Sequence, residues 1–277
     1  MDLQEQLERY AYLLRPFFRD VLFMNRDMLM LQLKNELKQH SPDNLILKGF
    51  SVYSQNEEDG ILNAIFRTLQ IPKPTFFEFG VHPAENNSLY LLLNGSKGVW
   101  FDSALTDYKA KLGQKDNLLI IDEFISLANI QQLCEKGLGF LGLEGGQLDM
   151  LSLDLDGNDF YIVEKMLQTG IEPKVLCLEY NAKFPLPMDI KIKYDEEHRW
   201  DGGDYQGCSL QAYINLLKEK YTLLACNLSG SNCFFIKNDL AGNFVVYDPA
   251  RLYMPCRYYL SAFNKGHFTS TNFLEVM

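Results

Sequence analysis

The segment that decides the fold reads Leu-Asp-Met-Leu-Ser-Leu-Asp-Leu-Asp-Gly-Asn-Asp-Phe, from Leu148 to Phe160. It begins as a short apolar run, which is typical of a buried strand, and it ends in three carboxylates, Asp154, Asp156 and Asp159. Because ligands of open α/β sheets bind beyond the carboxyl ends of the strands, this pattern predicts a site for a cation, a cofactor or a proton. The alternative is a solvated acidic turn in which Asp156 or Asn158 caps the next helix.

The composition limits the classes of protein. With 277 residues and 47% hydrophobic content, the chain can form one large domain, or a domain with an extension, around a sizeable core. A net charge of -10 without a run of Lys or Arg argues against nucleic-acid binding. Six cysteines without a CxxC pair favour a reducing, cytoplasmic location and no structural zinc. We expect no signal peptide and no transmembrane segment.

The N-terminal region, residues 2 to 39, shows helical periodicity. Apolar residues recur at steps of three and four between charged ones: Leu3, Leu7, Tyr10, Leu14, Phe17, Val21 and Met24. We expect a helical extension over residues 1–45, kinked or split at Pro16, that packs on the main domain or on a second subunit to give a homodimer. A membrane-surface helix is less favoured because the polar face mixes both charge signs.

Strands and helices alternate along residues 46–277, the expected α/β domain. Strands are predicted at 75–79, 98–101, 118–121, 148–153 and 175–178, followed by a pair at 221–226 and 232–236. Helices are predicted at 57–69, 87–93, 104–111, 127–135, 160–167 and 209–220. This alternation indicates a mostly parallel, doubly wound sheet, and the short connection within the last strand pair indicates an antiparallel edge.

The first and second strands end in residues that suit a nucleotide-type cofactor. Gly80 follows the first strand and precedes a helix, so the backbone can approach a ligand and the helix N-terminus offers N–H groups. Asp102 ends the second strand at the spacing of an acid that binds ribose hydroxyls. Two further glycines are replaced by His82 and Ala84, and Asn87 is alternatively only a helix N-cap.

The third and fifth strands add further candidates. The third strand ends at Asp122, and its apolar neighbours would flank an adenine ring or simply belong to the core. Glu179 and Asn181 follow the fifth strand and share a face of an extended chain, beside the strand that carries Asp154 and Asp156. This oxygen-rich set favours Mg²⁺ or Mn²⁺ over zinc. Alternatively, Glu179 and Asn181 cap the loop through hydrogen bonds.

The segment from Tyr194 to Tyr205 is rich in functional side chains and lacks regular periodicity. Loops of this kind display catalytic groups on α/β scaffolds. His198 can serve as a general base near neutral pH, or it is a solvated surface residue. Trp200 and Tyr205 would form the wall of an acceptor pocket or hold the loop in place.

These motifs, in their order along the chain, resemble the FkbM-like class I S-adenosylmethionine methyltransferases over residues 50 to 237. The segments that carry the resemblance are 53–62, 78–81 with 85–88, 98–102, 153–159, 179–181, 200–202 and 207–210. The resemblance implies a seven-stranded, Rossmann-like doubly wound sheet with a reversed last hairpin. It also implies that S-adenosylmethionine lies over the first two strand ends.

The same resemblance implies roles for individual residues. Cofactor binding would involve Glu78 and Gly80 at the methionine portion, Asp102 at the ribose, and Gln55 and Glu58 at the amino-acid end. Asn86 and Asn87, within the quoted segments, and Asp122, at the end of the third strand, are further cofactor-binding candidates. Independently of the resemblance, the residues themselves lead us to expect a cation held by Asp154, Asp156, Glu179 and Asn181, with His198 or a loop carboxylate removing the acceptor proton.

The expected function is therefore an S-adenosylmethionine-dependent O-methyltransferase, assisted by Mg²⁺ or Mn²⁺. The family analogy points to acceptors in bacterial surface polysaccharide, such as capsule, or in related glycan precursors. Two alternatives remain open. One is a metal-dependent hydrolase or glycan-modifying enzyme that uses the same carboxylates. The other is a catalytically inactive binding subunit, which the residues His82 to Ala84 would favour.

Overall fold

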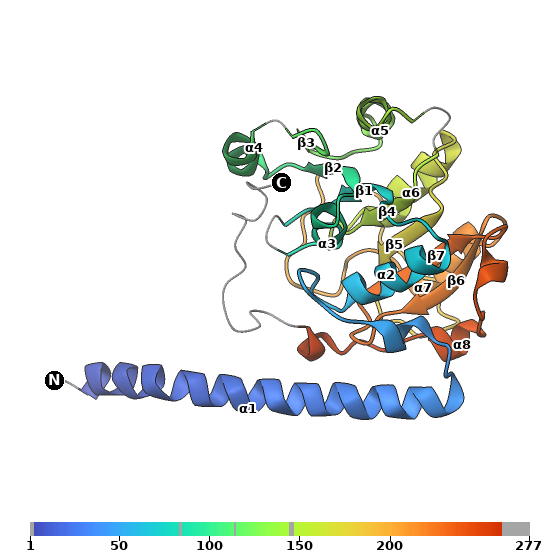
Figure 1. The fold of residues 1–277 in the computed structure, drawn as a ribbon. Helices are drawn as coiled ribbons and strands as arrows, with labels where there is room; N and C mark the ends of the chain where they lie inside the picture. The colour runs from blue at the N-terminus through green and yellow to red at the C-terminus, as the bar shows by residue number, and fades with distance from the viewer. Residues whose placement is uncertain (1–2, 83–84, 114, 144–146, 262–277) are drawn as a thin grey trace. The chain divides into compact units, whose positions relative to one another are not determined.

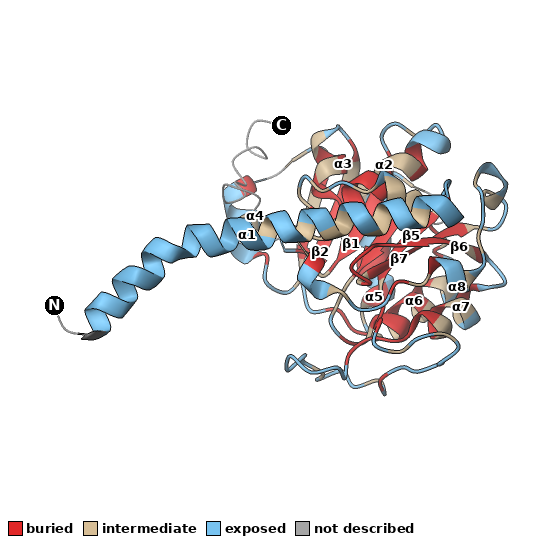
Figure 2. Ribbon diagram, turned by 90° about the horizontal axis from the view of Figure 1, so that it is seen from below, coloured by how far each residue is buried: buried red, intermediate tan, exposed pale blue. Residues whose placement is uncertain are grey.

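The computed structural model describes residues 3–82, 85–113, 115–143 and 147–261, and the chain divides into two compact units, Met1–Pro42 and Asp43–Met277. The first unit is one helix, α1 (Leu3–His40). Pro16 lies within it but does not split it, contrary to one of the two outcomes expected for this residue. Most of α1 is exposed along its length (Figure 2).

The second unit is built on a seven-stranded sheet (Figure 1). Its strands are β1 (Thr75–Phe79), β2 (Lys97–Asp102), β3 (Leu118–Asp122), β4 (Met150–Leu153), β5 (Val175–Glu179), β6 (Tyr221–Cys226) and β7 (Asn232–Lys237). Their order is β3-β2-β1-β4-β5-β7-β6, and β7 pairs antiparallel with both β5 and β6. All seven strands were predicted, and the expected reversal is limited to β7, since β6 again runs parallel to β5.

The helices and turns between the strands also follow the predicted alternation. The unit contains α2 (Glu58–Thr68), α3 (Leu89–Leu93), α4 (Thr106–Leu112), α5 (Ile130–Leu141), α6 (Asp159–Gln168), α7 (Leu210–Leu217) and α8 (Pro249–Leu252). Short 3-10 turns lie at η1 (Leu45–Lys48), η2 (Ala241–Asn243) and η3 (Tyr258–Leu260). The part of the chain that the structure describes contains no helix that is long and apolar enough to span a bilayer.

Both faces of the sheet are covered, which explains why its strands read as continuous apolar runs. One face carries Phe76, Trp100 and Ile120, which pack in a cluster with side chains of α2, α3 and α4. On the other face, Phe79 stacks on Phe101 at 4.1 Å between ring centroids, and α5 approaches the same aromatic group. This is the doubly wound, Rossmann-like arrangement that was expected.

The chain changes direction across the sheet between β1 and β4. From β1 the order runs outward to β2 and β3, and from β4 it runs the opposite way to β5. Gly80, at the end of β1, lies so close to the next strand that an added Cβ would be 1.5 Å from the carbonyl oxygen of Asp154, and its φ is +77°. In open α/β sheets this switch point, at the carboxyl ends of the strands, is where ligands bind.

Candidate functional site

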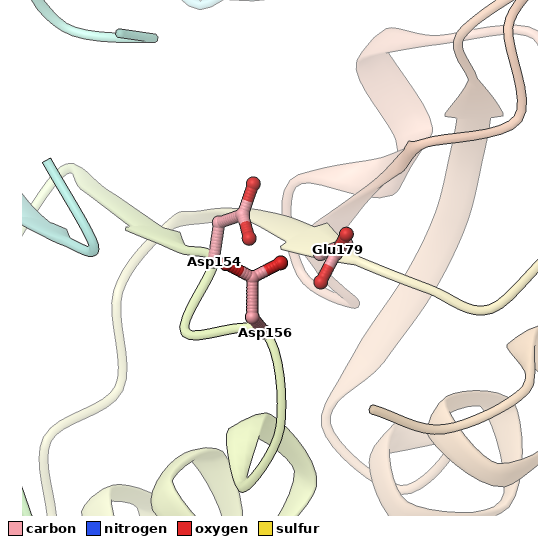
Figure 3. Close-up of side chains that lie close together, drawn as sticks. All are labelled: Asp154, Asp156 and Glu179. Atoms are coloured by element: carbon pink, nitrogen blue, oxygen red, sulfur yellow. The ribbon is translucent and has the colours of Figure 1, made fainter. Parts of the chain in front are cut away.

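Three acidic side chains converge at the carboxyl edge of β4 and β5. One oxygen each from Asp154, Asp156 and Glu179 can be chosen so that all three lie within 4.8 Å of one another. Figure 3 shows the three carboxylates turned toward a common space, two from the turn after β4 and one from the end of β5. Asp154 and Glu179 are half-buried, whereas Asp156 is exposed. The carboxylates proposed from sequence as metal ligands therefore lie together.

The turn after β4 is shaped by Asp159, the third acid of the sequence motif. Its fully buried carboxylate accepts the backbone N–H groups of Leu155 at 2.8 Å and Gly157 at 2.9 Å. Within this turn Asp156 adopts a left-handed conformation with φ +54°, which is uncommon for a residue other than glycine. Asp159 thus fixes the backbone that presents Asp154 and Asp156, and it is structural rather than a ligand.

His198 is brought to this turn from the loop between β5 and α7. The side chain of Asn158 donates to the carbonyl oxygen of Asp195 at 2.8 Å and accepts from its N–H at 3.3 Å, and the N–H of His198 bonds to the same carbonyl. The Asn158 side chain therefore makes no capping hydrogen bond to α6. The alternative interpretation, in which this side chain caps the helix, is wrong. A Cβ added at Gly157 would be 2.4 Å from the His198 ring, so only glycine permits this approach.

The three carboxylates of the cluster concentrate negative charge in a small space. Burial, followed by the charges of neighbouring carboxylates, raises the pKa of Asp154 and raises that of Glu179 well above its usual range. Although the Asp156 residue is exposed as a whole, partial desolvation of its carboxylate raises its pKa, while the charge of His198 lowers it. Among the described residues, no ion pair with Lys or Arg involves any of these three acids.

The residues present fit a hard divalent cation. The buried Oε2 of Glu179 and Nε2 of His198 have no hydrogen-bond partner, although buried polar atoms are normally paired. A cation bound by these carboxylates would offset their burial and the mutual repulsion that further raises the pKa of Asp154 and Glu179. Asp154, Asp156 and Glu179 would hold it.

Asn181 has a different part in the structure. Its Nδ2 donates to the carbonyl oxygens of Asp204 at 2.9 Å and Gln206 at 3.1 Å, and its Oδ1 accepts the N–H of Lys183 at 3.3 Å. Asn181 thus holds the long loop after β5 in place through hydrogen bonds, which is the alternative role that the sequence indicated for this residue. Its place among the proposed metal ligands stays a prediction.

The two aromatic residues of the same loop are both exposed. Trp200 donates its indole N–H to the carbonyl oxygen of Gly203 at 2.7 Å, and the Tyr205 hydroxyl accepts the N–H of Lys193 at 3.2 Å. The Tyr205 ring also contacts His198 edge-on, with 6.1 Å between ring centroids. Both residues hold the loop in place while leaving a ring surface open to solvent.

The turn after β1 is organised around Glu78, which is almost completely buried. Its carboxylate accepts the N–H groups of Asn87 at 2.7 Å and Ser88 at 3.0 Å, and it also bonds to the Ser88 hydroxyl. Burial raises the pKa of Glu78 to about 7 despite these hydrogen bonds. The buried Glu78 carboxylate therefore organises the loop through these hydrogen bonds.

The two asparagines of this loop make different hydrogen bonds. Asn86 accepts the N–H groups of Ser88 at 3.2 Å and Leu89 at 2.7 Å, so Asn86 caps α3. Asn87, the predicted N-cap, instead donates to Ser152 Oγ on β4 at 3.0 Å. The prediction for Asn87 as a cap was wrong because its side chain points to the sheet. His82 bridges to Glu85, and Pro83 and Ala84 lie outside the described residues.

Asp102 and Asp122 are neighbours at the ends of β2 and β3, where their Cα atoms are register partners. Asp102 accepts the N–H groups of Val81 at 3.0 Å and Ala104 at 2.9 Å, and burial raises its pKa. Asp122 accepts the N–H of Leu105 at 3.1 Å and the Thr106 hydroxyl, and these bonds lower its pKa. Each carboxylate oxygen keeps a further lone pair for a hydroxyl donor.

Gln55 and Glu58 lie before and within α2. Gln55 donates to Glu85 at 3.2 Å, which ties it to the turn after β1. Glu58 is fully buried and accepts from Asn227 at 2.6 Å and Asn232 at 2.8 Å, so it joins α2 to β7 and the turn before that strand. Their roles toward a cofactor stay predictions, because the structure occupies both side chains with protein partners.

Two residues near the site were not singled out from sequence. Asp59 accepts three backbone N–H groups, those of Val52 at 2.6 Å, Tyr53 at 2.8 Å and Ser54 at 3.1 Å, and thereby folds the segment before α2. Its position next to Glu58 in the quoted motif was the available signal. Burial raises the pKa of Tyr258, and smaller contributions from the charges of Glu179 and Asp154 place it near the cluster; no local pattern in the sequence marks this residue.

Comparisons with known proteins identify no close relative. No family model matches the chain, and no curated protein matches it. Solved structures with a related arrangement include a candidate S-adenosylmethionine-dependent methyltransferase from Listeria monocytogenes, 13% identical, with a TM-score of 0.36, 64% of this chain covered and 99% of that chain.

Two further structures are similar at the same low level. One is the Burkholderia thailandensis 1,6-didemethyltoxoflavin-N1-methyltransferase with bound 1,6-didemethyltoxoflavin and S-adenosylhomocysteine, 8% identical, TM-score 0.40, covering 83% of this chain and 89% of that one. The other is the MycE methyltransferase with Mg, S-adenosylhomocysteine and mycinamycin VI, 11% identical, TM-score 0.34, covering 64% of this chain and 44% of that one. At these levels of similarity only the site itself indicates the function.

Proposed function

We propose that this protein is an S-adenosylmethionine-dependent O-methyltransferase of the FkbM-like kind, assisted by Mg²⁺ or Mn²⁺. The observation that carries the proposal is the convergence of Asp154, Asp156 and Glu179, with His198 beside them, next to the switch point of a doubly wound sheet. This is the position where such sheets bind nucleotide-type cofactors.

The cofactor would lie over the ends of β1 and β2. Gly80 brings the backbone of β1 close to β4 with no side chain in the way, and Asp102 is half-exposed at the end of β2. The free lone pairs of Asp102 would accept the ribose hydroxyls. Asp122, one strand further out, would lie on the adenine side. The buried acids near Asp154 favour a cofactor that carries the positive charge of a sulfonium.

The chain's own residues would position the acceptor and take up its proton. Asp154, Asp156 and Glu179 would hold the cation, and when bound it would supply a Lewis acid that lowers the pKa of an acceptor hydroxyl. His198 has a buried Nε2 without a hydrogen-bond partner next to this group, which suits a general base. Because the methyl group of the sulfonium is already activated, alignment of acceptor and cofactor supplies the rest of the acceleration.

The acceptor would be a hydroxyl, or a phosphate-derived group, of a bacterial surface polysaccharide or a related glycan precursor. This finer statement is supported by the resemblance of the motifs to the FkbM-like family and by the exposed rings of Trp200 and Tyr205 near His198. The six free cysteines support a reducing, cytoplasmic site of action.

The test measures cofactor binding, metal binding and methyl transfer separately. Thermal melting with S-adenosylhomocysteine and with Mn²⁺ should each raise the melting temperature, by a stabilisation of about 2.7 kcal/mol at 100-fold excess over Kd. Labelled methyl from S-adenosylmethionine should then pass to glycan hydroxyls and stop when EDTA is added. Binding of Mn²⁺ without binding of S-adenosylhomocysteine would instead support a metal-dependent hydrolase or glycan-modifying enzyme. Binding of neither would support a catalytically inactive subunit.

A matched pair of variants tests whether loss of a charge matters only within the acidic cluster. Glu179→Gln removes a charge from the cluster, whereas Glu196→Gln makes the same change at an exposed position of the neighbouring loop. The proposal requires that only Glu179→Gln weaken Mn²⁺ binding and methyl transfer. Equal effects of the two substitutions would contradict it.

A further inference from the structure

Helix α1 carries an apolar stripe that the fold of the second unit does not explain. From Leu7 onward the stripe advances by alternating steps of three and four residues, and every position in it is apolar: Leu7, Tyr10, Leu14, Phe17, Val21, Met24, Met28 and Leu31. These eight side chains are between 38% and 67% exposed in the single chain. Exposed apolar stripes of this extent mark interaction surfaces.

The period of the stripe identifies the kind of partner. It repeats every seven residues, with Leu7, Leu14, Val21 and Met28 in the first core position of each heptad and Tyr10, Phe17, Met24 and Leu31 in the second. A straight helix drifts by about 20° per heptad against such a repeat, so a strict repeat favours supercoiling around another helix. A repeat sustained over three to four heptads indicates a coiled coil rather than a face packed on a sheet.

We propose that α1 pairs with α1 of a second copy of this chain in a parallel, two-stranded coiled coil. In a parallel pair, the positions that flank the core meet five residues apart across the two helices. Leu13 then meets Phe18 of the other copy, Asp20 meets Asn25 and Asp27 meets Gln32. These contacts are one apolar pair and two pairs of hydrogen-bonding groups, without a repulsion between like charges.

An antiparallel pair fits less well. The register that matches all core positions places Leu7 opposite Leu31 and Leu14 opposite Met24 of the other copy. The flanking Leu13 then faces Asp27, which would leave a carboxylate beside an apolar side chain, and Asp20 faces the same residue of the other copy, which adds a repulsion between like charges. Complementarity at the flanking positions therefore selects the parallel orientation.

A membrane surface is the competing kind of partner. Helices that lie on membranes carry mainly Lys and Arg on the polar face. On α1 the two charge signs alternate instead, and neighbouring residues pair: Arg19 lies 3.0 Å from Asp20, and Arg26 lies 2.8 Å from Asp27. Such a polar face suits water beside a protein partner better than anionic lipid. The inference does not depend on the proposed function.

Two tyrosines of α1 provide a matched test. Tyr10 lies in the core stripe, and Tyr12, two residues further on, points to the other side of the helix; their exposed fractions are 62% and 72%. Sedimentation of the full chain at micromolar concentration should give a dimer for the wild type and for Tyr12→Glu. Tyr10→Glu should raise the dimer dissociation constant at least about tenfold, because it buries a charge in the seam.

The orientation is tested by a disulfide. Met24→Cys, in a Cys256→Ser background that removes the exposed native thiol, should crosslink to its own copy on oxidation if the helices are parallel. Crosslinking of Met24→Cys only to Leu14→Cys would show an antiparallel pair and overturn the orientation. A monomeric wild type, equal effects of the two tyrosine substitutions, or binding of anionic vesicles by a monomer would overturn the proposal. Circular dichroism would verify that each variant keeps its helix.

Discussion

Two turns at the carboxyl edge of the sheet contain acidic side chains that differ in how many hydrogen bonds the protein gives them. After β1, the oxygens of Glu78 accept N–H groups from Asn87 and Ser88 and a hydroxyl from Ser88. After β4, Asp154 faces Asp156 and Glu179 across a short gap, and Glu179 Oε2 has no hydrogen-bond partner. The two strands are direct neighbours in the sheet.

The difference separates a carboxylate that builds the site from carboxylates that are available to a ligand. Glu78 meets its hydrogen-bonding needs within the protein, as buried polar groups normally do. The cluster at Asp154 is left with like charges and unused acceptors, which is costly unless a cation or protons are present. Strongly perturbed acids in such an arrangement mark functional sites more often than structural ones.

The largest expected effect concerns activity. Asp154→Asn should lower methyl transfer on the order of a thousandfold, because it removes one proposed ligand of the ion that stabilises the developing charge. The measurement is the rate of labelled methyl transfer at saturating Mn²⁺. Glu196→Gln is the control and should leave the rate unchanged. A normal rate for Asp154→Asn would place the chemistry elsewhere.

The next effect is the pH dependence of stability at Glu78. Burial raises the pKa of this carboxyl from 4.5 to about 7, so the folded protein keeps a proton that the unfolded chain has lost. The free energy of unfolding should therefore fall as the pH rises from about 4.5 to 7, by roughly 3 kcal/mol, and level off above that range. Urea unfolding at pH 5 and pH 8 measures it. An unchanged pH slope in Glu78→Gln would assign the effect to other groups.

A smaller effect is expected from Glu78→Gln at pH 5. The amide NH₂ would face the N–H groups of Asn87 or Ser88, and the unpaired donors should cost about 2 kcal/mol in the free energy of unfolding. Glu85→Gln, in the same turn, should change it by less than about 0.5 kcal/mol. If both variants unfold at the same urea concentration, Glu78 does not organise the turn.

The smallest expected effect is a gain in the free energy of unfolding, opposite in sign to the effect of Glu78→Gln. Without a cation at pH 8, Asp154→Asn should raise the free energy of unfolding by about 1 kcal/mol, because it removes one of several repelling charges. Mn²⁺ should then stabilise the wild type more than the variant. A loss of stability in Asp154→Asn would mean that this carboxylate, like Glu78, serves the fold.

The sequence by itself determined the strands, the helices and the acidic strand ends. Seven short apolar runs separated by amphipathic segments allow little besides a doubly wound sheet, because such strands are buried on both faces. The spacing from Gly80 to Asp102 and the acids around Gly157 are local patterns, and they remain visible without any knowledge of contacts. What these patterns could not specify is which acid receives hydrogen bonds.

Only the tertiary structure decided which acids receive hydrogen bonds and which side chains donate them. Glu58 is satisfied by Asn227 and Asn232, which lie 169 and 174 residues away in the chain. His198 reaches Gly157 because Asn158 binds the backbone of Asp195 across 37 residues. Asn87 turns to β4 while Asn86 caps α3. The physical reason is that a hydrogen bond depends on distance and direction between two groups, and for groups remote in sequence both are set only when the elements have packed together.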